Sequence, residues 1–479
     1  MTTVTAAAAA NRFGLGADAD ELTRIGGDPR GWLRTQLKPG AIDAFAGLPG
    51  SADYLSDYYA IRQMRRETKG KAGNAQAAAA ADDSTPKRVA MPEQRAFRRK
   101  LMQESILRQQ VALRSQQPFA ERIVRFWSNH FAISVDKRIA APFAAPMERE
   151  AIRPHAFGNF ADLLLAVERH PGMLLYLDNA QSVGGDSRLA ERSGRRQQAN
   201  PQQRKRGLNE NLARETLELH TLGVDGGYSQ ADVIELARAI TGWSVASPRD
   251  SSGMRGDDAF VFRANAHEPG ARHVLGKTCA DDGEAQGRHI LHNLALHPAT
   301  ARHLSFKLAR HFVADVPPPA LVDRMARAYL ASGGELTAMY RPLIDDDAAW
   351  STDARKFKTP DDFTLSALRA CGLYRPGDVV VSLDLLARMG QPLFQPRSPA
   401  GFADTAADWS GPDALFKRVQ AAQALAERVP VTAAVPLQMG MAALGPALDP
   451  ETATALRRAE SVQQGIALLL ASPAFQWRC

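Results

Sequence analysis

The sequence lacks the features that define several large classes of protein. Only three cysteines, Cys279, Cys371 and Cys479, occur in 479 residues, and none has a Cys-x-x-Cys or Cys-x-x-His spacing. We therefore expect neither a disulfide framework nor a thiolate zinc site. No window approaches the ~18 consecutive apolar residues of a membrane-spanning helix. The N-terminus also has no cationic region followed by a strongly apolar one, so the sequence predicts a cytoplasmic protein without its own export signal.

Common catalytic signatures are also missing. We find no nucleophile elbow, phosphate-binding loop or dinucleotide fingerprint. The basic residues exceed the acidic ones, 59 against 52, and much of the excess lies in the runs 62–71, 87–100 and 192–206. No recognition motif with interleaved aromatic residues accompanies these runs, so nucleic acid is not an expected partner.

The composition favours helices. Hydrophobic residues make up 45% of the chain and charged residues 23%, which is ordinary for a globular protein. Alanine is abundant, whereas valine and isoleucine are sparse outside short runs. Two β-like runs, 259–262 and 273–276, flank a turn-rich linker. We therefore predict a mainly α fold, a multi-helix orthogonal or bundle-like assembly with one small β-hairpin near 259–276.

Low-complexity polar stretches suggest how the chain is divided. We expect an N-terminal helical segment (1–66), a flexible insertion (67–91), a first part of the helical core (92–180), a flexible basic insertion (181–206), a central helix–turn–helix motif (207–246), a hairpin excursion (247–280) and a C-terminal helical part (281–479).

The central motif carries the densest polar pattern. At ~100° per residue, its first helix has an apolar face bordered by a stripe that contains Asn211, Glu215 and Glu218. Glu210, Arg214 and Glu218 follow at i, i+4 and i+8, a ladder that can pair internally. Glu215 has no cation at i±4. It must be exposed, protonated or served by another part of the chain.

The remainder of the motif is read from turn and capping signals. His220 lies roughly opposite Glu218 on the helical wheel, which argues against a Glu-x-His metal pair. Gly223 is expected at the C-cap of the first helix. Ser229 is expected to cap the second helix, with Asp232 completing a capping box. Trp243 is positioned to pack back on it.

Two further residues combine polar chemistry with an apolar helix face. His130 shares a face with Phe126 and Trp127, which fits either a satisfied core histidine or a ligand or proton shuttle. Glu148 lies on an alanine-rich stripe and would need a partner if buried, most commonly an arginine. Arg149 and Arg153 are on the same helix but are expected to face elsewhere.

The segments 126–138, 147–179, 209–243, 297–315 and 469–478 together resemble the bacterial family called domain of unknown function 1800. The resemblance implies a mainly helical protein without an agreed reaction. It also implies a partner and co-export, because members are often encoded beside an exported protein similar to the alkaline phosphatase and sulfatase superfamily. The residues that match the family pattern are Trp127, Asn129, His130, Glu148, Arg149, Arg153, His155, Asn209, Glu210, Asn211, Arg214, Glu215, Glu218, Trp243 and His267.

One departure from the pattern follows His267. The family tends to carry a lysine before its Val-Leu-Gly run, where this chain has Arg272 and His273. If that lysine contacts an anion, an arginine can serve with altered geometry. His267 itself is expected in a solvated loop.

Two functional hypotheses remain open. In the first, the protein is a binding or accessory subunit for a phosphatase- or sulfatase-like partner, and its polar residues form a network between helices or bind a ligand. That set is Asn209, Asn211, Arg149, Arg153, Arg214, His155, His267 and Trp243. In the second, the protein is an enzyme such as a metal-dependent hydrolase, with catalytic candidates Glu215, Glu218, Glu148 and His130. No motif indicates a cofactor; those side chains could hold a divalent metal, or Glu215 could act as a general acid or base.

Overall fold

Helices dominate the computed structural model of the chain, which describes residues 5–40, 42–75, 92–199, 207–248, 259–352, 354–433 and 435–478. The helices of the first half are α1 (Ala6–Ala8), α2 (Glu21–Ile25), α3 (Pro29–Arg34), α4 (Ser51–Ala75), α5 (Pro92–Arg114), α6 (Pro118–His130), α7 (Ala144–Met147), α8 (Arg153–His155), α9 (Phe160–Glu168), α10 (Pro171–Tyr176), α11 (Arg188–Ala199), α12 (Asn211–Glu215) and α13 (Gln230–Ala239).

The second half continues in the same way. Its helices are α14 (Glu284–Ala295), α15 (Pro298–Phe312), α16 (Pro319–Ala331), α17 (Leu336–Asp345), α18 (Pro360–Ala370), α19 (Pro376–Arg388), α20 (Ala406–Trp409), α21 (Pro412–Ala426), α22 (Pro436–Leu444), α23 (Pro450–Arg457), α24 (Val462–Ala471) and α25 (Pro473–Gln476). Short 3-10 turns stand at Asp43–Phe45, Ala141–Phe143, Asn179–Gln181, Asp347–Trp350, Val431–Ala433 and Gly445–Ala447. The mainly α fold class is therefore confirmed.

Local sequence explains where many helices begin. Proline stands in the first turn of α6, α10, α15, α18 and α21, where its fixed φ suits the helix and its missing N–H costs nothing. Ser229 and Asp232 form the expected capping box at α13, and Thr359 and Asp362 form another at α18. Gly223 follows the first helix of the motif with φ +86°, as a C-terminal glycine does.

Three segments of π-helix interrupt the α-helices: η1 (Ala9–Phe13), η4 (Glu148–Ile152) and η6 (Thr216–Thr221). A π-helix closes i→i+5 hydrogen bonds, is rare, and is frequently found at functional sites. Segment η4 starts at the carboxylate expected on an apolar stripe. Segment η6 forms the second half of the first helix in the central motif, so both affect the candidate residues directly.

The described strands form three antiparallel pairs. Strand β1 (Trp243–Val245) pairs with β2 (Phe260–Phe262), β3 (Arg272–Val274) pairs with β4 (Lys277–Cys279), and β5 (Lys356–Phe357) pairs with β6 (Trp477–Arg478). The two β-like runs are strands, as expected, but the hairpin that would join them to each other is absent among these pairs. The first run pairs with β1, which directly follows α13. The second run pairs with β4, because a tight turn at Leu275 and Gly276 reverses the chain after β3.

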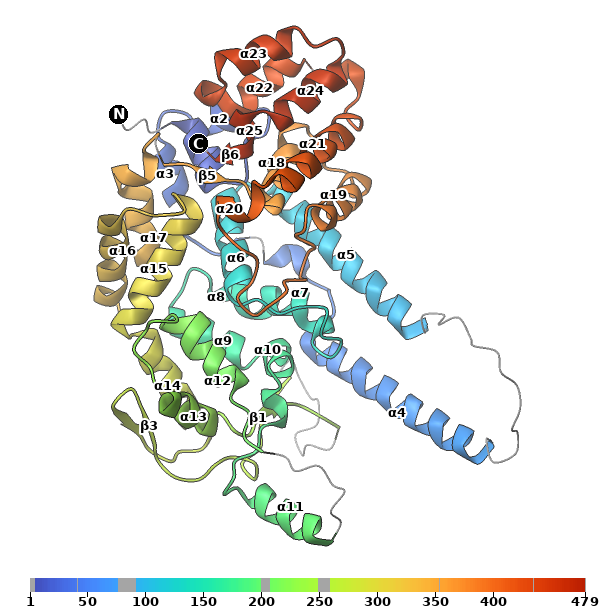
Figure 1. Cartoon of the computed structure of the whole chain (residues 1–479), viewed down its shortest axis with the longest axis vertical. Helices are drawn as coiled ribbons and strands as arrows, with labels where there is room; N and C mark the ends of the chain where they lie inside the picture. The colour runs from blue at the N-terminus through green and yellow to red at the C-terminus, as the bar shows by residue number, and fades with distance from the viewer. Residues whose placement is uncertain are drawn as a thin grey trace.

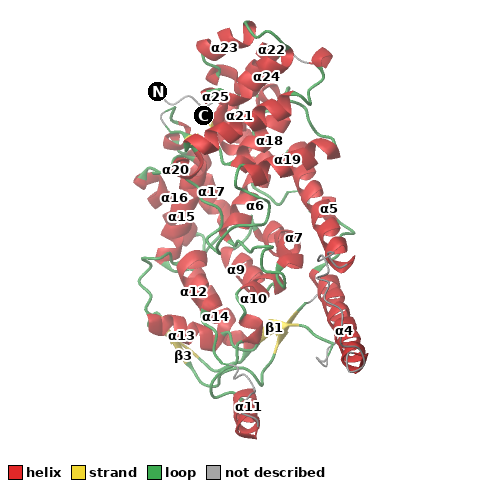
Figure 2. Cartoon of the chain, turned by 45° about the vertical axis from the view of Figure 1, so that its right-hand side comes forward, coloured by secondary structure: helices red, strands yellow, loops and turns green. Residues whose placement is uncertain are grey.

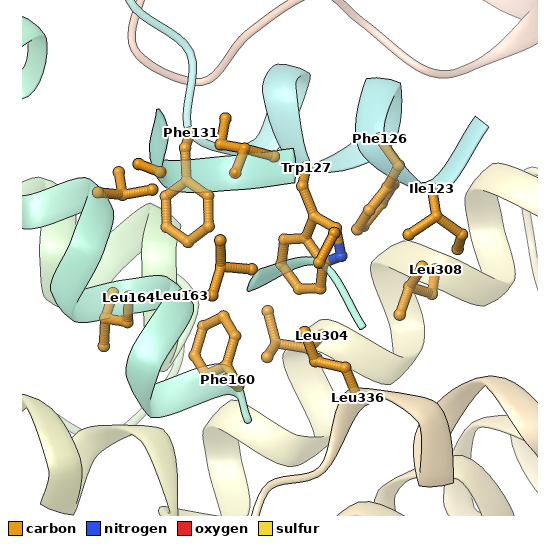
Figure 3. Packing of buried hydrophobic residues seen from close by; sticks show 14 of the residues in the cluster. Ile123, Phe126, Trp127, Phe131, Phe160, Leu163, Leu164, Leu304, Leu308 and Leu336 are labelled. Atoms are coloured by element: carbon orange, nitrogen blue, oxygen red, sulfur yellow. The ribbon is translucent and has the colours of Figure 1, made fainter. Parts of the chain in front are cut away.

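Two hydrophobic cores stabilise the described parts of the chain. The larger core surrounds Trp127, which is packed against Phe131, Phe160 and Leu304 (Figure 3). The second core joins α18, α19 and α21–α25 to the C-terminal end of α5. These C-terminal helices gather at one end of the molecule, and the central motif lies toward the other (Figure 1).

The two insertions contain more helix than the composition suggests. Helix α4 continues to Ala75, and α11 occupies Arg188–Ala199, whereas 76–91 and 200–206 lie outside the described residues. Both helices project from the main body, as the two views show (Figures 1 and 2). None of the described helices is long and apolar enough to cross a membrane.

Candidate functional site

Glu148 lies in a buried chain of ion pairs. Its Oε2 accepts a hydrogen bond from Nε of Arg108 at 2.7 Å, and its Oε1 accepts from Nη2 of Arg153 at 3.2 Å. Arg153 also binds both carboxylate oxygens of Glu121, at 2.6 and 3.0 Å. The expectation of an arginine partner is thus confirmed, and two helices besides that of Glu148 are joined through it.

The position of Arg153 corrects one prediction. On an α-helix Arg153 faces away from Glu148, but η4 winds more widely and places residues i and i+5 on one side. Arg149 does face elsewhere, toward Glu104 at 3.4 Å and the Pro49 carbonyl. Burial by itself would raise the pKa of Glu148, but the charges of Arg108 and Arg153 lower it to about 2. A carboxylate held ionised in this way is a poor proton donor.

A second buried cluster forms around η6 of the central motif. Nδ1 of His220 lies 2.7 Å from Oε1 of Glu168, the last residue of α9. The Thr216 hydroxyl lies 3.1 Å from the same oxygen and 2.7 Å from the Leu212 carbonyl oxygen, and it can donate to either. His220 and Glu168 are almost completely buried. Because an ionised carboxylate only accepts, Nδ1 carries the proton, and the buried Nε2 of His220 has no hydrogen-bond partner among the described residues.

His130 and His303 approach the end of η6 from two other helices. Nε2 of His130 lies 3.2 Å from the His220 carbonyl oxygen, and Nε2 of His303 lies 3.3 Å from that of Leu219. The last carbonyls of a helix have no intrahelical donor. Since a carbonyl only accepts, both imidazoles carry their proton on Nε2. The two histidines therefore cap η6 from the side.

The tautomer of His130 defines its contact with Lys307. Nζ of Lys307 lies 2.9 Å from Nδ1 of His130, which accepts because the proton is on Nε2. Burial lowers the pKa of His130 well below its usual value, and the charge of Lys307 adds to the effect. Burial also lowers the pKa of Lys307 to about 8, against the attraction of Asp404. The prediction that His130 points into the core is confirmed.

Glu215 remains without a partner. It is half-buried and makes no hydrogen bond or ion pair within the described part of the chain. Burial raises the pKa of Glu215, and the charges of Glu218 and Glu168 add to the rise, whereas His220 and Arg214 oppose it. No arginine among the described residues forms an ion pair with this carboxylate, which takes no part in the ion pairs of Glu148.

The other polar residues of the motif work locally. Glu210 pairs with Arg214 at 3.1 Å, as expected, and both contact Gln230 of α13. Glu218 instead accepts a hydrogen bond from the Tyr228 hydroxyl at 3.3 Å. Oδ1 of Asn209 accepts from the backbone N–H of Asn211 at 2.9 Å.

These contacts contradict one part of the network prediction. The Asn211 residue is exposed, and the Arg214 side chain is 41% exposed, so neither can join a buried network with Arg149 and Arg153. The reason lies in the fold: α12 packs on α13, whereas the arginines belong to the helices around η4.

Trp243 and His267 are both buried within the fold. Trp243 is fully buried in β1, with the Phe260 ring edge-on at 5.8 Å. His267 is also buried, and its Nδ1 lies 3.0 Å from the carbonyl oxygen of Thr241. The prediction of a solvated loop histidine is wrong, because the loop folds back against the end of α13. The Arg272 side chain lies 3.6 Å from the Glu235 carboxylate, so the anion that it contacts belongs to the chain itself.

His155 lines a cavity of about 360 Å³. The cavity is also lined by Ser51, Glu150 and His170, which are hydrogen-bonded to one another. Glu150 accepts from both the backbone N–H and the hydroxyl of Ser51, at 3.0 and 2.6 Å. This trio therefore caps the N-terminus of α4 and holds it against the body.

The four catalytic candidates do not meet at one place. Glu148 belongs to the ion pairs and His130 to the histidine cluster. Glu215 ends α12, and Glu218 lies in η6 and accepts from Tyr228. Across the described ranges, no three His, Cys, Asp or Glu side chains are grouped so that they could hold a metal ion.

Sequence reasoning missed Glu168, His303, Lys307 and Arg108. Arg108 and Glu168 lie on helices whose other residues gave no reason to single them out. The usable signal was the spacing of His303 and Lys307, four residues apart and therefore on the same side of one helix.

The fold and these clusters define a class: a helical protein organised around buried histidine and arginine groups at π-helical segments. The sequence model of the DUF1800 family, described as a protein of unknown function, matches residues 8–477. The chain belongs to this family. No curated protein and no solved structure matches it.

Proposed function

We propose that this protein is a binding or accessory subunit that works with a partner similar to the alkaline phosphatase and sulfatase superfamily. The observation that carries the proposal is the fixed position of Glu148 between Arg108 and Arg153. Glu148 was a candidate for a catalytic site between helices, but both of its oxygens are hydrogen-bonded to arginines that join those helices. Buried polar groups that are hydrogen-bonded to one another make the fold rigid, and a rigid fold presents a stable surface to a partner.

An exposed apolar stripe on α21 supports a binding role. Leu415, Phe416 and Val419 occupy one side of this helix at spacings i, i+1 and i+4, and Phe416 is 61% exposed. Apolar side chains gathered on one helix face mark a contact surface more often than singly exposed residues do. Co-export with the partner would follow if the complex forms before export.

Co-purification tests the proposal. The protein is expressed with a phosphatase-like protein of the kind often encoded beside members of the family, and the complex is measured by size-exclusion chromatography with light scattering. We expect one complex, weakened at least tenfold by Phe416→Asp. Val316→Asp is the matched control, since Val316 is 85% exposed and lies outside α21, between α15 and α16. Separate elution of the two proteins at micromolar concentration overturns the proposal, as does equal weakening by both variants.

A second function rests on the unpaired Glu215. A half-buried carboxylate with a raised pKa beside a histidine can transfer a proton. If the protein is an enzyme, Glu215 is its general acid or base. A hydrolase screen on purified protein, repeated with Glu215→Gln, tests this alternative, together with elemental analysis for divalent metals. An activity that survives Glu215→Gln unchanged removes Glu215 from it.

A further inference from the structure

The segment 391–404, here called the strap, contacts the last turn of α6 at Asn129 and the loop after α6 at Val135. The Asn129 side chain binds the strap backbone at Phe402 twice: its Nδ2 donates to the carbonyl at 2.9 Å and its Oδ1 accepts from the N–H at 2.8 Å. The Phe394 carbonyl accepts from the Val135 N–H at 2.9 Å. The strap is thus held at both ends and closes a cavity beneath it.

The cavity has a volume of about 70 Å³. This is several times the ~10–15 Å³ that one water molecule requires. Its charged lining consists of Arg108 of α5, Arg125 of α6 and Asp361 of α18, two guanidinium groups and one carboxylate. The lining therefore carries an excess of positive charge.

Both arginines have unused donors. Nη1 of Arg108 and Nε of Arg125 are buried and have no hydrogen-bond partner among the residues described. The two side chains are only 8% and 9% exposed. Of the other nitrogens, Nε of Arg108 donates to Glu148, and Nη1 and Nη2 of Arg125 donate to Asp361 and Gln109. An unpaired buried N–H on a charged group is costly, so an acceptor in the cavity would be strongly favoured.

The two guanidinium groups also repel each other. Burial lowers the pKa of Arg108, and the charge of Arg125 lowers it further, whereas Glu148 opposes the shift. Two like charges at one cavity are relieved by a negative charge that both can contact.

We propose that the cavity beneath the strap binds a small oxyanion, a carboxylate or an inorganic phosphate or sulfate, through Arg108 Nη1 and Arg125 Nε. Guanidinium groups suit such ligands because their N–H donors match the spacing of carboxylate and phosphate oxygens. Ser128 and Asn129 also line the cavity. The site is independent of the proposed accessory role, since either can exist without the other.

Anion titration of the full chain tests the site. The melting midpoint is measured at constant ionic strength with increasing phosphate, sulfate or acetate, against chloride alone. Binding to the folded state raises the midpoint with ligand concentration. We expect a rise of a few degrees for at least one oxyanion and none for chloride. A larger rise with acetate assigns the site to a carboxylate ligand, and a larger rise with phosphate or sulfate to an inorganic one.

Cavity-filling variants separate this site from general anion effects. Ala132 is buried and lines the cavity, so Ala132→Met occupies the ligand's space while every arginine pair remains. Leu393→Trp does the same from the half-buried strap and serves if the first variant does not fold. Ala331→Met, on the exposed side of α16, is the matched control.

We expect both filling variants to lose the oxyanion-dependent rise and the control to keep it. In calorimetry with phosphate or acetate, the wild type should bind one equivalent and the filling variants none. An equal rise in all variants overturns the proposal. The proposal is also overturned if no oxyanion raises the melting midpoint of the wild type, since the cavity would then hold only water.

Discussion

Nδ1 of His220 lies 2.7 Å from Oε1 of Glu168, and this hydrogen bond joins the central motif to the end of α9. Both side chains are almost completely buried. The bond fixes η6 against α9. In this position the His220 and Leu219 carbonyl oxygens at the end of η6 accept from His130 and His303. The polar residues of the motif thus build one packed junction, in which each imidazole either accepts from or donates to a defined neighbour.

Removal of Glu168 should destabilise this junction. Glu168→Ala leaves the buried His220 Nδ1–H without an acceptor, whereas the Thr216 hydroxyl keeps the Leu212 carbonyl oxygen at 2.7 Å. We therefore expect a loss of about 2 kcal/mol in the free energy of unfolding. Glu168→Gln keeps one acceptor oxygen and should lose about half as much. Urea unfolding followed by circular dichroism gives both values. Glu218→Gln is the control and should stay within about 0.5 kcal/mol; a Glu168→Ala loss of similar size would contradict the role of the bond.

Glu148→Gln should lower the free energy of unfolding more than Glu168→Ala does. It removes the buried charge that pairs with Arg108 and Arg153. Loss of one partner from a buried ion pair costs about 3–5 kcal/mol, because the remaining charges are left uncompensated. The melting midpoint and urea midpoint should both fall. Glu451→Gln, at an exposed position of α23, provides the reference, and a result equal to that reference would be inconsistent with the ion-pair chain.

The ion pairs of Glu148 should also make the stability of the protein depend on pH in the acid range. The pKa of Glu148 falls from 4.5 to about 2 on folding, because the two arginines favour the charged form. Its contribution is therefore fully present above pH 4.5 and is lost as the pH falls toward 2. Unfolding free energies measured from pH 5 to 2.5 should decline in the wild type. The decline should be shallower in Glu148→Gln; an identical slope would show that other groups cause it.

His303 should give the stability a second pH dependence, at higher pH than that of Glu148. Burial and the charge of Lys307 lower its pKa from 6.5 to about 4. The folded state then binds fewer protons than the unfolded state between these values, so stability should fall as the pH decreases from 6.5 to 4. His303→Gln can still donate to the Leu219 carbonyl and should flatten this part of the profile. Nuclear magnetic resonance titration of the imidazole measures the pKa directly, and a value near 6.5 would refute the prediction.

Asn129 predicts a local effect on the strap. Asn129→Ala removes two hydrogen bonds to the Phe402 backbone. We expect a loss of about 1–3 kcal/mol and faster amide exchange confined to the strap. Hydrogen exchange with mass spectrometry separates the strap from the rest of the chain. Asn209→Ala removes a side-chain acceptor elsewhere and is the control; equal exchange of the strap in both variants would argue against this anchoring.

Some of these relationships could be expected from the sequence, and others could not. The arginine partner of Glu148 follows from the cost of a buried charge, but its identity as Arg108 requires the packing of α5 on α7. Arg153 was excluded by α-helical spacing, which does not hold in η4. His220 was correctly separated from Glu218, yet its pairing with Glu168 depends on how α9 crosses the motif. The strand positions near 259–276 followed from composition, but their partners depended on which segment came closest.

The sequence by itself determined the helical class, many helix starts and the family, because proline, capping residues and apolar periodicity act over a few neighbouring residues. Only the tertiary structure decided which polar residues meet. Ion pairs such as Arg108 with Glu148, and hydrogen bonds such as His220 with Glu168, join helices that are far apart along the chain. Their partners are selected by packing geometry and by the cost of burying an unpaired polar group, and neither can be read from local spacing.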